Sequence, residues 1–261
     1  MKLNLEEKVV LITGASKGIG RAIAETCASE GASLALCART EKDLVRAASD
    51  LSRRFNIDTL PVAADLSRLE GVRDCVERVV AHFSRIDTLV NVAGAIRPGT
   101  LLSKPDADWL EDYDLKLFGY VRMMREVFPL MKKNGGRIIN IIGSAGRCAD
   151  PAYIAGGGAN AALMNITKAA AVEGGPHNIL INGINPGPTR TERWDKINSH
   201  LSAEWGLPID EVIALRLKGN PLGRPADPAS IAAMVAFLAS SRAADINGAI
   251  IEMDGGSNPC L

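Results

Sequence analysis

The feature that most constrains the fold of this chain is a glycine-rich turn between a predicted strand and a predicted helix near the N-terminus. Residues 9–13, VVLIT, form a short apolar and β-branched run that is typical of a buried strand. The next seven residues, 14–20, read GASKGIG, and apolar residues then recur at helical spacing through residues 21–28. Such a turn lets the backbone approach a phosphate closely, and the free N–H groups at the start of the helix face the negative charge. Taken alone, the pattern fits either a dinucleotide site or an ordinary tight turn.

Strand and helix patterns alternate along all 261 residues without a linker, a repeat or a low-complexity break. This alternation predicts one α/β domain over residues 1–261. We expect a doubly wound, Rossmann-type fold with a seven-stranded parallel sheet and helices on both faces. The predicted strands are residues 9–13, 33–37, 58–63, 87–92, 136–142, 179–184 and 249–252. In such a sheet the ligand binds outside the carboxyl ends of the strands.

Four further motifs follow predicted strands, and with the glycine turn they resemble the landmarks of the short-chain dehydrogenase/reductase family. The turn has that family's G-x-x-x-G-x-G spacing. Residues 65–67 (DLS) resemble its adenine-contacting segment, 91–94 (NVAG) its N-x-A-G turn, 185–187 (NPG) its nicotinamide loop, and 253–256 (MDGG) its C-terminal D-G-G. The resemblance covers nearly the whole chain and implies a nicotinamide-dependent oxidoreductase. The residues assigned to cofactor binding are Gly14, Ser16, Lys17, Gly18, Ile19, Gly20, Arg39, Asp65, Leu66, Asn91, Ala93, Gly94, Pro186, Gly187 and Thr189.

The end of the second predicted strand indicates which nicotinamide cofactor binds. NAD-selective relatives carry an acidic residue here, which holds the ribose hydroxyls and would repel the 2′-phosphate of NADP. This chain has no acid at that point and has Arg39 instead, whose planar guanidinium suits a phosphate, with Lys17 as a second cation. The alternative is that both are ordinary solvated cations. We expect NADP(H), with NAD(H) less favoured.

The catalytic half of the chain departs from the family pattern. The resemblance implies a catalytic Ser at Ser144, but the register through residues 160–187 puts Gly156 at the position of the usual Tyr and Asn160 at that of the usual Lys. In the family, this Tyr exchanges a proton with the substrate oxygen, and the Lys lowers the pKa of the Tyr.

Two other residues are candidates to replace the missing pair. Tyr153 precedes Gly156 by three residues, so on a helix it would share nearly the same face, about 4.5 Å earlier along the axis. Lys116 occupies the position at which the family's long helix carries an Asn, as if Asn and Lys had exchanged places; Asn160 would then hold the water of the proton relay. The alternative is that the pair has decayed and that Lys116 faces solvent or a subunit interface.

Composition excludes several classes of protein. The 30 basic and 30 acidic residues cancel, so neither nucleic acid nor an anionic membrane surface is expected as a partner. No signal peptide or membrane-spanning stretch is predicted, which favours the cytoplasm. The three histidines share no ligand-like spacing, and we expect no metal. Scattered cysteines favour reduced thiols over disulfides; they are Cys27, Cys37, Cys75, Cys148 and Cys260.

The substrate and the assembly are less constrained. A lid segment is expected at about 188–225, and its Trp194 and Trp205 would either line an apolar pocket or pack within the lid. Three arginines near the predicted mouth, Arg147, Arg190 and Arg193, are either anion-recognising groups or ordinary surface cations. Two long helices, at about 107–131 and 153–173, are expected to pack a homotetramer. The expected function is NADP(H)-dependent interconversion of a small-molecule carbonyl and an alcohol; the alternative is a non-catalytic NADP(H)-binding sensor or scaffold.

Overall fold

The computed structural model describes residues 2–94 and 96–259. Cys260 lies outside the described residues. Cys27, Cys37 and Cys75 are buried thiols, and the Cys148 sulfur lies 3.2 Å from the Asn258 Oδ1. In the described part of the chain, no helix has both the length and the apolar character needed to cross a bilayer. Nor does any cluster of three or more His, Cys, Asp or Glu there suit a metal ion.

The core is a parallel seven-stranded sheet in the order β3-β2-β1-β4-β5-β6-β7. This confirms the doubly wound prediction. Chain order reverses where β1 pairs with both β2 and β4, so the strand ends of β1 and β4 border the crevice that binds ligands in such folds. The strands are β1 Val9–Thr13, β2 Ser33–Ala38, β3 Thr59–Ala63, β4 Thr88–Asn91, β5 Gly136–Ile141, β6 Ile179–Pro186 and β7 Ile250–Met253.

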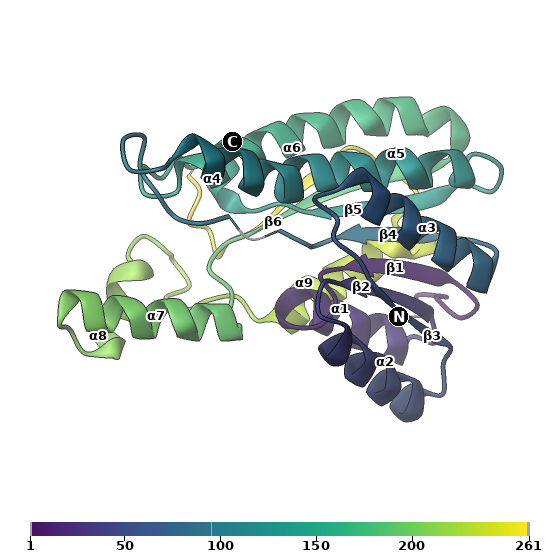
Figure 1. The fold of residues 1–261 in the computed structure, drawn as a ribbon, viewed down its shortest axis with the longest axis horizontal. Helices are drawn as coiled ribbons and strands as arrows, with labels where there is room; N and C mark the ends of the chain where they lie inside the picture. Colours follow the sequence, from purple (N-terminus) through teal and green to yellow (C-terminus); the bar gives the residue numbers. More distant parts are fainter. Residues whose placement is uncertain (1, 95, 260–261) are drawn as a thin grey trace.

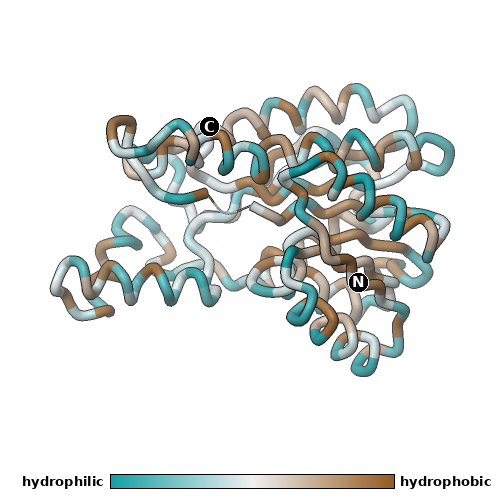
Figure 2. The backbone as a smooth tube through the Cα atoms, viewed as in Figure 1, coloured by the Kyte–Doolittle hydropathy of each residue, from teal (hydrophilic) through white to brown (hydrophobic). Residues whose placement is uncertain are grey.

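Helices cover both faces of the sheet (Figure 1). Alternate residues of β1 divide between two cores: Val10 and Ile12 pack toward α1, α2 and α9, whereas Val9 and Leu11 pack toward α3 and α5. Because both faces are covered, the central strands are mostly apolar, and Figure 2 shows this apolar centre between more polar outer surfaces. These helices are α1 Gly18–Ser29, α2 Glu41–Phe55, α3 Leu69–Phe83, α5 Gly119–Met131, α6 Ile154–Gly174 and α9 Pro228–Ala239. Short 3₁₀ turns are η2 Ser144–Gly146, η3 Gly175–His177 and η4 Ser241–Ala243.

The segment expected as one long helix at 107–131 is interrupted. It consists of α4 Asp106–Tyr113, a π-helical turn η1 Asp114–Phe118, and α5. Lys116 lies in the middle of the π-helical turn and is buried. Turns of this kind inside α-helices are frequent at functional sites.

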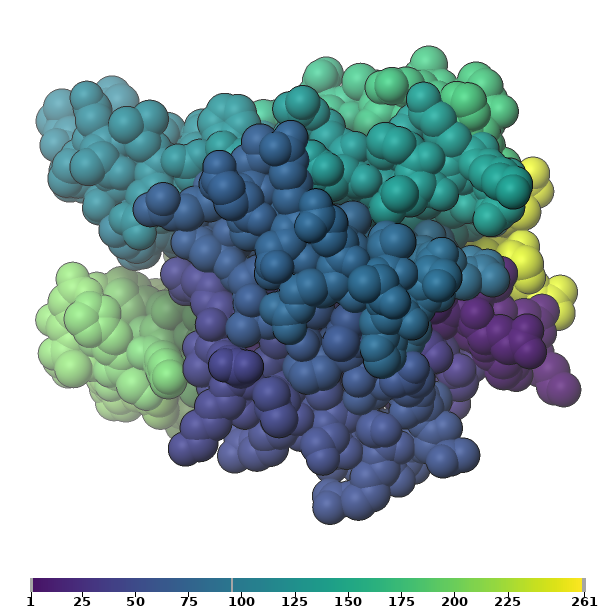
Figure 3. Space-filling view, turned by 45° about the vertical axis from the view of Figure 1, so that its right-hand side comes forward, coloured from purple at the N-terminus to yellow at the C-terminus, as the bar shows by residue number. Residues whose placement is uncertain are grey.

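Helices α7 (Glu192–Trp205) and α8 (Ile209–Arg216) stand apart from the sheet, beyond the end of β6 (Figure 1). They form a separate lobe next to the body of the molecule in the space-filling view (Figure 3). The Thr191 hydroxyl caps α7 by accepting from the Trp194 N–H at 3.4 Å. Trp194 is buried, with Arg216 of α8 over its ring, whereas Trp205 at the far end of α7 is 45% exposed.

Candidate active site

The glycine turn is shaped by close backbone contacts. Gly14 has a φ of +66°, and a Cβ at this position would lie 3.0 Å from the backbone N of Ala93. A Cβ at Gly20 would lie 2.2 Å from the Gly14 carbonyl oxygen. Among the described residues no side chain caps α1, so the N–H groups at its start are left for another acceptor. The turn therefore has the close packing and the uncapped helix start that a phosphate site requires.

Arg39 and Asp65 follow β2 and β3, which are neighbours in the sheet. Burial raises the pKa of the Asp65 carboxyl, but hydrogen bonds from Ser67 and the charges of Arg39 and Arg68 outweigh it and hold that pKa below its ordinary value. Arg39 and Lys17 are both exposed. Neither forms an ion pair within residues 2–94 and 96–259, so both cations remain available to a ligand.

A cavity of about 270 Å³ lies at the carboxyl edge of the sheet. The ends of β4, β5 and β6 form one side of it, and residues of α7 and α8 form the other. Seven of the predicted site residues line it together: Ile19, Gly94, Lys116, Tyr153, Pro186, Gly187 and Thr189.

The Tyr153 ring lies against Gly156. A Cβ at Gly156 would be 1.9 Å from Cε1 and 2.2 Å from Cζ of Tyr153, so the ring occupies the space of a side chain at position 156. Tyr153 itself precedes α6 with φ −135° and ψ 39°, so it reaches this place from outside the helix and not from its first turn. The helical placement assumed from the sequence was therefore wrong, although the phenol does span to position 156. A second tyrosine packs against the same run of glycines: a Cβ at Gly158 would lie 2.6 Å from the Tyr113 hydroxyl.

Burial raises the pKa of the Tyr153 phenol. The charge of Arg193 and a hydrogen bond from it lower this pKa, whereas the charge of the Asp112 carboxylate raises it further. Because the net direction is upward, Tyr153 is protonated at neutral pH.

Lys116 points into the same cavity from the π-helical turn. Its Nζ donates to the carbonyl oxygens of Ile141 at 2.8 Å and Ile142 at 3.2 Å, and to the hydroxyl of Tyr120 at 3.1 Å. A Cβ at Gly94 would lie 2.4 Å from the Lys116 Cδ, so a glycine is required for this path. Burial, together with the charge of Arg193, lowers the pKa of Lys116 to about 7. Lys116 is buried inside the chain, so the alternative in which it faces solvent or a subunit interface is wrong.

Asn160 is buried beside Gly143. Its Nδ2 lies 2.8 Å from the position of a Cβ on Gly143, whose φ is +138°. Its Oδ1 is buried and has no hydrogen-bond partner among the described residues. A buried acceptor of this kind needs a partner, and a bound water would supply one.

Ser144 follows Gly143 as the first residue of η2, and its carbonyl accepts from the N–H groups of Arg147 and Cys148. Gly143 lines the cavity, but Ser144 does not. The structure thus brings Tyr153 and Lys116 to one cavity wall and leaves Ser144 one residue away from it.

Asparagines tie the strand ends together beneath these groups. Asn91 is fully buried and its Nδ2 donates to the Asn140 Oδ1 at 2.9 Å, while the Asn185 Oδ1 accepts from Gly143 N at 3.3 Å. Asn91 does not line the cavity, so its predicted contact with the cofactor is indirect in this geometry. Gly187 permits close approach of the last strand, because a Cβ there would lie 2.8 Å from the Asp254 Cα.

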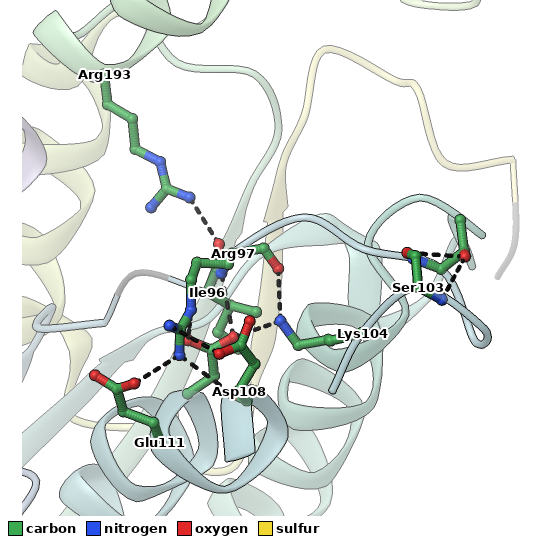
Figure 4. Close-up of polar contacts among 9 residues, drawn as sticks. Ile96, Arg97, Ser103, Lys104, Asp108, Glu111 and Arg193 are labelled. Atoms are coloured by element: carbon green, nitrogen blue, oxygen red, sulfur yellow. Dashed lines mark hydrogen bonds and ion pairs between the residues drawn. The ribbon is translucent and has the colours of Figure 1, made fainter. Parts of the chain in front are cut away.

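A charged cluster that the sequence patterns did not reveal holds the loop between β4 and α4 (Figure 4). The Lys104 Nζ lies 2.7 Å from Asp112 Oδ2 and donates to the Arg97 carbonyl at 3.1 Å, and Arg97 pairs with Asp112, Asp108 and Glu111. Asp112 and the Lys104 side chain are buried, so this pairing fixes the loop firmly to α4.

Arg193 links this loop to α7. Its Nη2 donates to the Ile96 carbonyl oxygen at 3.0 Å (Figure 4). Of the three arginines considered from the sequence, only Arg193 lines the cavity. Arg147 pairs with Glu252 at 2.6 Å, and Arg190 is exposed.

Comparisons with known proteins agree with this architecture. The family model described as Enoyl-(Acyl carrier protein) reductase matches residues 14–258. The short-chain reductase protein NovJ of Streptomyces niveus is 34% identical over 254 residues, 96% of this chain and 94% of the relative. The 3-oxoacyl-(acyl carrier protein) reductase FabG of Vibrio harveyi is 33% identical over 258 residues, 97% of this chain and 98% of the relative.

A solved structure is similar over the full length. L-sorbose reductase from Gluconobacter frateurii, complexed with NADPH and L-sorbose, has a TM-score of 0.96 and 34% identity, covering 100% of both chains. The fold, the strand-end motifs and these matches together define an oxidoreductase built on a dinucleotide-binding sheet. The chain belongs to the short-chain dehydrogenase/reductase family.

Proposed function

We propose that the protein is an NADPH-dependent reductase that interconverts a small carbonyl compound and its alcohol, with Tyr153 and Lys116 in place of the family's usual Tyr and Lys. The observation that carries this proposal is the Tyr153 ring, which fills the space above Gly156 and lines the same cavity as Lys116.

The residues present fit the cofactor. The close contacts at Gly14 and Gly20 and the uncapped start of α1 suit a pyrophosphate, and Arg39 with Lys17 suits the 2′-phosphate. The L-sorbose reductase that this chain resembles was solved with NADPH. Pro186, Gly187 and Thr189 would hold the nicotinamide, which supplies the hydride when the cofactor is bound.

Tyr153 is the proton donor in this scheme. Its raised pKa keeps the phenol protonated at neutral pH, so it can give its proton to the carbonyl oxygen as the hydride reaches the carbonyl carbon. The phenolate that remains regains a proton from solvent, and the unpartnered Oδ1 of Asn160 would hold a water on that path.

Lys116 acts on this step through its charge when it is protonated, and its lowered pKa of about 7 leaves it partly protonated at neutral pH. An ammonium has three N–H donors, and the contacts with Ile141, Ile142 and Tyr120 use all three. A direct hydrogen bond to the Tyr153 phenol would therefore need one of these contacts to break. We propose that the positive charge of Lys116, which lines the same cavity, acts together with that of Arg193, which hydrogen-bonds the phenol, to stabilise the phenolate that forms at Tyr153.

The test is NADPH oxidation followed by absorbance across a set of ketones and aldehydes, with the purified full chain. Turnover of at least one carbonyl that is lost in Lys116→Met supports the proposal. Tight NADPH binding without oxidation of NADPH by any carbonyl contradicts it and supports the alternative, an NADP(H)-binding sensor or scaffold. The position of Ser144 off the cavity wall is the observation that favours this alternative.

A further inference from the structure

The cavity contains positive charge that nothing in its wall balances. Lys116, Arg193 and Arg216 line it, and no Asp or Glu does so in the described part of the chain. Lys116 is buried among carbonyl oxygens and a hydroxyl, and no carboxylate of residues 2–94 or 96–259 contacts its Nζ. Arg216 is half-buried, stacks over the Trp194 ring with its Cζ 4.1 Å from the centroid, and donates to the Asn198 Oδ1. These cations therefore have neutral partners only.

Two cations of the loop between β4 and α4 are paired with acids. Figure 4 shows the contrast, because Arg97 and Lys104 meet the carboxylates of the loop cluster whereas Arg193 donates to the Ile96 carbonyl. Arg193 also hydrogen-bonds the neutral phenol of Tyr153. Arg193 is exposed and Arg216 is half-buried, so water solvates both guanidinium groups when no ligand is bound. An anionic group of a ligand is the partner that this unpaired positive charge favours.

The cofactor phosphates are expected at a different place. The pyrophosphate site is the start of α1, and Thr191 marks that end of the cavity because its Cγ2 lies 3.6 Å from the position of a Cβ on Gly18. Arg193 points away from that end, toward Ile96 and Tyr153. The unbalanced charge thus lies on the side of the proton donor, where a substrate would bind.

We propose that the carbonyl substrate carries an anionic oxygen group, a carboxylate or a phosphate, and that Arg193 and Arg216 bind this group. The inference rests on the proposed function, because it takes the cavity as the place where the carbonyl meets Tyr153. A guanidinium can bind either oxyanion through two parallel hydrogen bonds. The cavity, of about 270 Å³, must also admit the nicotinamide, so small oxo acids and small phosphorylated ketones are the suitable probes.

The test is calorimetric titration of the full chain loaded with NADP⁺. The probes are pyruvate, acetoacetate and levulinate against their methyl esters, and dihydroxyacetone phosphate against dihydroxyacetone. At least one anion is expected to bind roughly tenfold or more tightly than its neutral counterpart. Arg193→Gln should remove this difference and Arg193→Lys should restore part of it. Arg190→Gln is the matched control, because Arg190 is exposed and does not line the cavity.

Three results would overturn the inference: neutral probes that bind as tightly as the anions, no binding of any anion at millimolar concentration, or an anion preference that survives in Arg193→Gln. The melting temperature of the same variant reports whether it is folded, and its NADPH affinity, measured by fluorescence, reports whether Arg193 serves the cofactor phosphate. If that affinity falls as much as the anion affinity does, Arg193 serves the cofactor phosphate and the inference is wrong. Because binding is measured without turnover, absence of reduction would count against the proposed function alone.

Discussion

Substitution of Gly156 by Ala tests the placement of the Tyr153 ring with a single methyl group. The added Cβ would stand 1.9 Å from Cε1, 2.2 Å from Cζ and 2.4 Å from Cδ1 of Tyr153, whereas ordinary contacts begin at 3.4 Å. The ring must therefore move by about 1.5 Å or leave its place. A misplacement of about 1 Å at a reacting group costs on the order of a hundredfold in rate. We expect kcat for carbonyl reduction to fall by about that factor.

The fold should tolerate this change. Ala is favoured over Gly inside a helix by up to about 1 kcal/mol, which offsets much of the roughly 1–3 kcal/mol that overpacking costs. The melting temperature and NADPH affinity are expected to stay close to those of the wild type, because the glycine turn at α1 is untouched. Gly157→Ala is the matched control, since its Cβ would lie 3.1 Å from the Ala145 carbonyl oxygen and does not meet Tyr153. Wild-type kcat in Gly156→Ala would refute the argument that the ring must lie in this space.

Three further outcomes are expected. NADPH should bind more tightly than NADH in a fluorescence titration, and a preference for NADH would contradict the assignment of Arg39 to the 2′-phosphate. Arg39→Ala should lower NADPH affinity about tenfold, while Arg46→Ala, an exposed control on α2, should leave it unchanged. The pKa of Lys116 is lowered from 10.5 to about 7 in the folded protein, so between pH 7 and 10.5 Lys116 is protonated in the unfolded chain but largely neutral in the folded one. The free energy of unfolding should therefore rise with pH over this range, by up to a few kcal/mol. Urea melts should show this rise in the wild type and a smaller one in Lys116→Met, and identical pH profiles would count against a buried Lys116. Light scattering should detect a homotetramer, with Leu110, Phe118 and Val172 among the exposed apolar residues available for its interfaces, and a monomer at micromolar concentration would oppose this.

Most of the sheet could be predicted because its strands are buried on both faces. Residues 9–13 read as a continuous apolar run, and β1 has those bounds. The sixth strand was predicted to stop at residue 184 but β6 continues to Pro186, since Asn185 and Pro186 pair with β7 although Asn185 is polar and Pro186 lacks an N–H group. The hydropathy of the sequence does not show which polar residues pair with a neighbouring strand, so the end of β6 could not be predicted from it.

The site was only partly predictable for a related reason. The register identified Gly156 as an empty position and Tyr153 as near enough to fill it, but the non-helical backbone of Tyr153 depends on the turn that precedes α6. The π-helical turn at Lys116 and the Gly94 that admits its side chain depend on tertiary packing. Arg193 and Arg147 looked alike in the sequence, and only the positions of α7 and of Glu252 distinguish a cavity residue from an ion-paired one.

The central claim is that Tyr153 transfers the proton in the relocated site. The most direct measurement is the single-turnover rate of NADPH oxidation in Tyr153→Phe, compared with Tyr113→Phe, which removes the hydroxyl that packs against Gly158 outside the cavity. A general acid contributes about 10²–10⁴-fold, so Tyr153→Phe is expected to lose at least a hundredfold in rate with NADPH binding intact, while Tyr113→Phe stays near the wild type. Equal rates in Tyr153→Phe and the wild type would show that another group supplies the proton.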